Sequence, residues 1–74
     1  MKVILTNHAK ERMVVRKITE KMVKEALANP DNQGVGYQNR FLVFKSFGAG
    51  VVKVVCAKEK NSYIVISAIW EKRK

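Results

Sequence analysis

The sequence predicts an α+β domain in which two N-terminal helices pack on a three- to four-stranded antiparallel sheet. Apolar residues recur at helical spacing between residues 7 and 28, whereas β-branched and aromatic residues dominate from residue 41 onward. Short turns separate the apolar runs of the second half, and such turns join antiparallel neighbours. With 74 residues the chain is long enough for one domain, residues 1–74, with a modest core.

The first helix is expected over residues 7–16, after a short extended lead at residues 1–5. Thr6 or Asn7 can cap its N-terminus, because either side chain accepts a hydrogen bond from a free backbone N–H one turn on. The helix therefore begins close to the end of the lead, with no room for a long loop.

The second helix is expected over residues 19–28. Thr19 is a good N-cap, and Glu20 places a carboxylate in the first turn, where the helix dipole favours it. Pro30 disfavours a helical conformation at Asn29 and therefore ends the helix.

Four strands are expected, the first of them weak because glycines interrupt it, at residues 34–38, 41–46, 51–57 and 62–70. Alternation along the third strand predicts two faces, one with Val52, Val54 and Cys56 and the other with Val51, Lys53 and Val55. The sheet is thus expected to present one face to the two helices.

The net charge of +9 comes from 15 Lys and Arg against 6 Asp and Glu. Such an excess attracts polyanions, and nucleic acid is the most common of them. An acidic protein partner, or selection for solubility, would favour the same composition. Charge alone leaves these three explanations open.

Composition also limits the chemistry. Cys56 is the only cysteine, which excludes an intramolecular disulfide and a zinc site built from cysteines. One His and no carboxylate pair at ligand spacing lead us to expect no metal and no cofactor. No apolar run is long enough to span a bilayer and no secretory signal is evident, so a cytoplasmic location without membrane contact is expected.

A candidate site lies in the first helix. At about 100° per residue, His8, Arg12 and Arg16 form one stripe. This stripe runs beside Ala9 and Met13, the expected core edge of the helix. An imidazole and two guanidiniums in a row could bind a phosphate or another anion. The alternative is a helix with a solvated basic side, which arises easily in so basic a chain.

A His-Ala-x-x-Arg-Met-x-x-Arg block is followed by an Ile-Thr helix start, a mid-helix Val and an Asn-Pro-Asp segment. These residues are His8-Ala9, Arg12-Met13, Arg16, Ile18-Thr19, Val23 and Asn29-Pro30-Asp31. In this block the chain resembles a family of small bacterial and archaeal domains of unknown function. That family is similar in layout to the BrnT and RelE/ParE-type toxins of toxin–antitoxin pairs.

The resemblance implies a RelE-like fold and a small cytoplasmic toxin that cleaves RNA and is neutralised by a separate antitoxin. RelE-type toxins place their working basic residues on the concave sheet and the C-terminal strand. In this chain Arg40, Lys53 and a basic tail with Lys72 and Arg73 could occupy such positions. The tail could equally be a frayed, solvated terminus.

A metal-free ribonuclease needs a base for the 2′-OH, an acid for the leaving 5′-oxygen and cations for the phosphorane. His8 is the candidate for proton transfer and Arg12 for the phosphate, while Tyr37 or Trp70 could stack a base. The further candidate nucleic-acid contacts are Arg16, Arg40, Lys53, Lys72 and Arg73. The alternative function is a non-catalytic module that binds nucleic acid, or an acidic antitoxin or other partner. Independently of function, Arg12 could be a structural anchor that reaches a strand carbonyl or a glutamate, and Trp70 could pack in the core or at the sheet edge.

Overall fold

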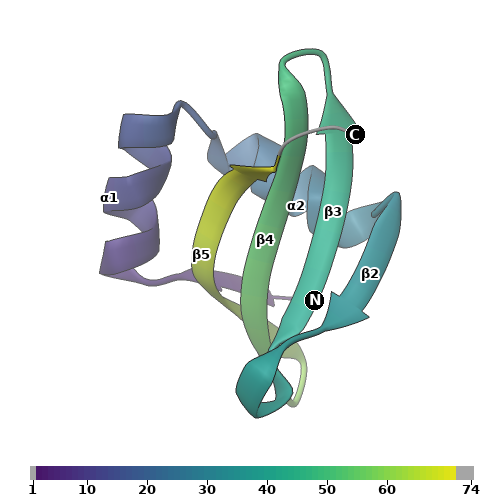
Figure 1. Ribbon diagram of the computed structural model, residues 1–74. Coiled ribbons are helices and arrows are strands. Elements are labelled where there is room, and N and C mark those ends of the chain that lie inside the picture. The colour runs from purple at the N-terminus through teal and green to yellow at the C-terminus, as the bar shows by residue number, and fades with distance from the viewer. Residues whose placement is uncertain (1, 72–74) are drawn as a thin grey trace.

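The computed structural model describes residues 2–71. Two helices and five strands follow one another as β1 (Lys2–Leu5), α1 (Asn7–Arg16), α2 (Glu20–Ala28), β2 (Asn32–Val35), β3 (Phe41–Phe47), β4 (Gly50–Glu59) and β5 (Ser62–Glu71). The strands form one sheet in the order β1-β5-β4-β3-β2. In Figure 1, α2 crosses behind this sheet and α1 stands beside β5.

The expectation of a three- to four-stranded antiparallel sheet is wrong, although the α+β class holds. The sheet has five strands and is mixed, because β1 pairs parallel with β5 from Lys2↔Ser62 to Leu5↔Val65. The extended lead is therefore a strand. Its apolar run is too short to show alternation, and its partner lies far along the chain, where no local turn signals the pairing.

The strand expected at residues 34–38 is found instead as β2, at Asn32–Val35. Residues Tyr37–Asn39 form a short 3₁₀ turn, in which Gln38 and Asn39 have φ of 56° and 59°. A left-handed backbone cannot continue a strand, so β2 ends before this turn and β3 begins after it.

The helices begin and end on side-chain and backbone caps. The Thr6 hydroxyl accepts a hydrogen bond from the Ala9 N–H and donates one to the Val65 carbonyl, both at 3.1 Å. It thus caps α1 and fixes the helix to β5 at the same time. Lys17 adopts a left-handed conformation with φ of 59° and ends α1, and Thr19 caps α2.

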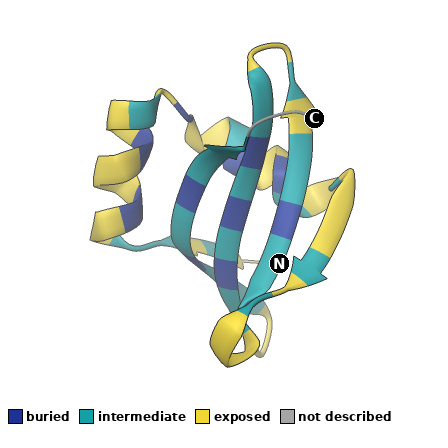
Figure 2. Cartoon of the chain, viewed as in Figure 1, coloured by how far each residue is buried: buried dark blue, intermediate teal, exposed yellow. Residues whose placement is uncertain are grey.

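The core lies between the helices and one face of the sheet. The helices contribute Ala9, Met13, Val23 and Ala26 to it, each less than 5% exposed. The buried strand residues alternate, as Figure 2 shows by the dark bands along β3, β4 and β5. They are Val43, Val52, Val54, Cys56, Val65 and Ala68. Two helices therefore cover one face only, and the apolar residues between those bands lie on the other face.

Two reciprocal hydrogen bonds join the end of α1 to the C-terminal half of β5, in addition to the contact of Thr6 with Val65. β1 pairs with Ser62–Val65 only, so the C-terminal half of β5 has no strand neighbour on that side. There the Arg16 Nη1 donates to the Ala68 carbonyl at 3.0 Å, and the Trp70 indole N–H donates to the Arg16 carbonyl at 2.6 Å. Helix α1 thus protects an exposed strand edge that would otherwise pair with another chain.

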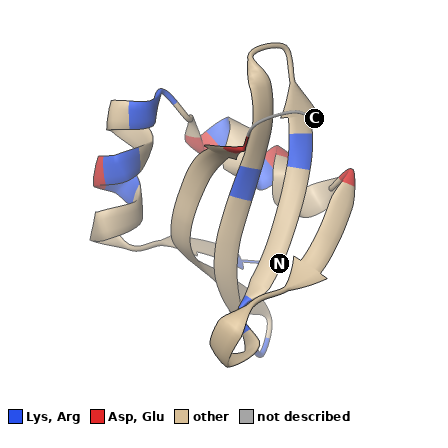
Figure 3. Ribbon diagram, in the orientation of Figure 1, with Lys and Arg blue, Asp and Glu red and all other residues tan. Residues whose placement is uncertain are grey.

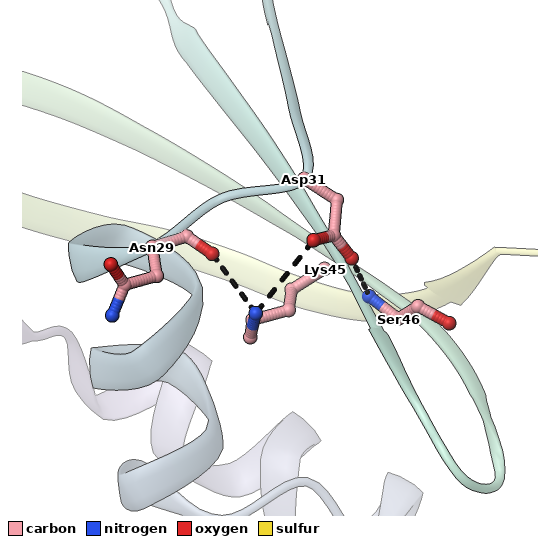
Figure 4. Close-up of polar contacts among 4 residues, drawn as sticks. All are labelled: Asn29, Asp31, Lys45 and Ser46. Carbon is pink, nitrogen blue, oxygen red and sulfur yellow. Dashed lines mark hydrogen bonds and ion pairs between the residues drawn. The ribbon is translucent and has the colours of Figure 1, made fainter.

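A second joint ties the end of α2 to β3 (Figure 4). Asp31 accepts a hydrogen bond from the Ser46 N–H at 2.7 Å, and its other oxygen lies 3.7 Å from the Lys45 Nζ. Lys45 also donates to the Asn29 carbonyl at 3.0 Å, next to the helix end. The Asn-Pro-Asp segment is therefore a structural corner that holds α2 against the sheet.

Candidate functional site

The predicted stripe of His8, Arg12 and Arg16 divides into a structural and an exposed part. Arg16 is half-buried, and its guanidinium donates to the Ala68 carbonyl. His8 and Arg12 are exposed, one turn apart on α1. No hydrogen bond or ion pair engages either side chain within residues 2–71. His8 and Arg12 are therefore free to meet a ligand, whereas Arg16 is occupied in holding the helix.

The remaining predicted contacts lie apart from this pair. Arg40 is half-buried at the end of the 3₁₀ turn between β2 and β3. Lys53 lies on β4, on the sheet face away from the helices, and its Nζ is 3.6 Å from a Glu71 carboxylate oxygen. Lys72 and Arg73 lie outside the described residues. The predicted residues thus lie on three separate parts of the surface. His8 and Arg12 share one part, whereas Arg40 and Lys53 each lie on another.

The two aromatic candidates also differ. Tyr37 is 94% exposed on the 3₁₀ turn and can stack on a base. Trp70 packs against the core and uses its indole N–H on the Arg16 carbonyl, so its role is structural. Tyr63 stacks on Phe41 with ring centroids 6.0 Å apart.

Two lysines beside the groove between α1 and the start of α2 were not among the residues predicted from the sequence. The groove has a volume of about 500 Å³, and its lining includes Lys10 and Lys17, the carboxylate of Glu20 and apolar side chains such as Met13 and Val14. Lys10, Val14 and Lys17 follow one another at helical spacing, and this is the signal that could have revealed them. Figure 3 shows basic segments on both helices and at the corner that joins them, with acidic segments between them on each helix.

Cys56 is an inert core residue. It is fully buried on β4, and its thiol donates weakly to the Phe41 carbonyl at 3.5 Å. Burial raises the pKa of the Cys56 thiol from 9.0 to about 11. Because the thiolate is the nucleophilic form, the folded protein offers no reactive thiol at neutral pH.

A domain of unknown function, DUF4258, matches residues 5–70. The chain belongs to the DUF4258 family. No curated protein and no solved structure matches it. Among residues 2–71 of this chain, no three His, Cys, Asp or Glu side chains form a group that could bind a metal ion. Neither of its two helices is long and apolar enough to cross a membrane.

Replacing Arg16 by Ala is expected to lower the free energy of unfolding by about 1–3 kcal/mol, because the Ala68 carbonyl loses its donor at a partly buried edge. Arg12→Ala is the matched control. It removes an exposed guanidinium with no protein partner, so its effect is expected within about 0.5 kcal/mol. Urea denaturation of the two variants measures the difference, and equal effects would show that Arg16 does not anchor α1.

Stability at alkaline pH is expected to depend on Cys56. In the unfolded chain the thiol ionises near pH 9, whereas in the folded chain it keeps its proton up to about pH 11. Its favourable contribution is therefore complete below pH 9 and is lost between pH 9 and pH 11, by roughly 3 kcal/mol at most. Urea denaturation across this range should show a steeper loss for the wild type than for Cys56→Ala. Parallel curves would contradict the assignment.

Proposed function

We propose that this DUF4258 domain binds nucleic acid, with RNA as the principal ligand, through the exposed basic surface of its two helices. The observation that carries the proposal is that most of its cations have no internal partner. Within residues 2–71 the ion pairs are Lys45 with Asp31 and Lys53 with Glu71. The exposed lysines and arginine of the helix layer therefore remain available to phosphates.

We call the exposed cations of the helix layer the helix surface, and its members are Lys10, Arg12, Lys17, Lys21 and Lys24. The exposed carboxylates of Glu11, Glu20 and Glu25 lie among them, so the helix layer keeps a net positive charge but is not uniformly basic. All five cations are exposed, and Lys10 and Lys17 line the groove between the helices. Four of the five are lysines, which attract phosphates as point charges and suit binding without sequence readout. The expected ligand is thus a flexible single strand whose backbone follows the helices.

RNA cleavage, as in RelE/BrnT-type toxins, is the second candidate function. What favours it is the exposure of His8 and Arg12, because both residues carry the family resemblance and neither has an internal contact that would explain its presence. His8 could accept the 2′-OH proton while Arg12 stabilises the charge of the phosphorane. Binding requires no further group, whereas cleavage needs an acid for the leaving oxygen, so binding is the function that the geometry supports best.

The helix surface is expected to account for the salt dependence of binding. Lys17→Gln/Lys21→Gln removes two charges at the corner of the helices, whereas Lys58→Gln/Lys60→Gln removes two from the far end of the sheet. The pairs are matched, because each includes one lysine with a left-handed backbone. The measurement is fluorescence anisotropy of a labelled single-stranded oligoribonucleotide across a salt series.

The slope of log affinity against log salt should fall by about 1.4 for the Lys17/Lys21 variant, at roughly 0.7 per phosphate contact, and change little for the control. Equal losses in both variants would show a diffuse charge effect rather than a helix surface. Absence of wild-type binding at about 50 mM salt would overturn the proposal.

If the domain also cleaves RNA, wild-type protein should cut a single-stranded oligonucleotide in the presence of EDTA, and His8→Ala should remove that activity while circular dichroism shows an intact fold. Asn7→Ala, an exposed change at the neighbouring position, controls for effects on the helix start. Intact RNA after incubation with a wild-type sample that binds it would leave binding as the function.

A further inference from the structure

The sheet has one large face that no helix covers. Helix α2 crosses behind the strands in Figure 1, and no element formed by residues 2–71 lies on the opposite side of β3, β4 and β5. We call this side the open face. Strand alternation and register place on it seven apolar side chains, namely Leu42, Phe44, Val51, Val55, Ala57, Ile64 and Ile69.

The apolar residues of the open face do not belong to the core. The partly buried side chains that pack on the core are Val3, Leu5, Met22, Leu27, Phe41, Phe47 and Trp70, all from the helices or the covered face. The open-face residues are half-buried by one another, which leaves their outer surfaces in water. A contiguous apolar face of this kind marks an interaction site.

The open face is also the electroneutral part of a basic molecule. Its charged residues in β1, β4 and β5 are Lys2, Lys53, Glu59 and Glu71, two of each sign. Among residues 2–71 the excess of positive charge therefore lies on α1, at the corner after it and at the ends of the sheet, because the two lysines of α2 are balanced by two glutamates. Electrostatic attraction does not favour binding of a polyanion to the open face. A neutral apolar surface can bind there, because both surfaces then bury apolar area.

We infer that the open face is the interface of a homodimer, in which two copies pack sheet against sheet about a two-fold axis. In a two-fold interface residue i meets residue j and j meets i, so the surface must complement itself. Lys53 and Glu71 satisfy this condition, because they lie 3.6 Å apart, are partly exposed and carry opposite charges. In the dimer Lys53 of each copy pairs with Glu71 of the other.

The neighbours of Lys53 support the same arrangement. In the register Lys53 lies between Phe44 on β3 and Ile69 on β5, so its charge stands at the centre of apolar side chains. Burial of this charge is less costly because Glu71 already pairs with Lys53 within the chain, and the two residues can exchange partners across the axis. Two sheets with apolar inner faces pack about 10 Å apart, close enough for such an exchange.

Size and charge permit this assembly. The Cα positions extend over 32 × 24 × 22 Å, so the broadest side of the molecule has a projected area of the same order as the ~800 Å² per partner that stable interfaces bury. The basic helices point away from the interface, and salt screens charges more than about 10 Å apart, so the net charge does not prevent association.

Reciprocal charge reversal tests the inference. Lys53→Glu opposes Glu71 of the other copy with a second carboxylate, and Glu71→Lys opposes Lys53 with a second ammonium. Each variant alone is expected to raise the dimer dissociation constant at least tenfold, whereas an equimolar mixture should form heterodimers with wild-type affinity or better. Sedimentation velocity measures the masses against the 8.4 kDa of one chain.

Lys21→Glu is the control, since it makes the same charge change on the exposed surface of α2 and should leave the dimer intact. Val55→Thr is a second variant of nearly equal volume and β propensity, and it should weaken the dimer without loss of fold. A monomeric wild type at high micromolar concentration would overturn the inference. Failure of the mixture to associate, or equal dissociation by Lys21→Glu, would overturn it as well.

Discussion

The structure depends on one constraint: two short helices can cover only one face of a five-stranded sheet. The apolar residues of α1 and α2 pack on Val43, Val52, Val54 and their neighbours, and this contact forms the whole core. The opposite face keeps its apolar residues in water, while the helices turn their cations outward. A small domain of this kind thus acquires two chemically different surfaces, a basic one and a neutral apolar one.

Much of this arrangement follows from local sequence signals. The caps at Thr6 and Thr19 and the alternation of Val52 with Lys53 are properties of neighbouring residues. The parallel pairing of β1 with β5 does not follow from neighbouring residues, because it pairs Val3 with Tyr63, 60 positions further along the chain. The α+β class is therefore predictable from local sequence signals, whereas the mixed, five-stranded sheet is not.

The candidate site was predictable in part, for a related reason. Helical spacing brings His8, Arg12 and Arg16 to one stripe, but it does not show that Arg16 donates to a carbonyl of β5. Most residues that carried the resemblance prove to be scaffold: Ala9, Met13 and Val23 are buried, and Asp31 holds the corner beside β3. The self-complementary pair of Lys53 and Glu71 depends on strand register, which local patterns do not define.

The central claim is that the two surfaces are separate in function, with the helices contacting RNA and the open face contacting a second copy. Amide chemical-shift mapping by NMR tests it most directly, first in a titration with a single-stranded oligoribonucleotide and then in a protein dilution series. We expect RNA to shift the amide resonances of α1 and α2, and dilution to shift those of Phe44, Lys53 and Ile69. Shifts of the open-face resonances on addition of RNA, with the helices unaffected, would contradict it.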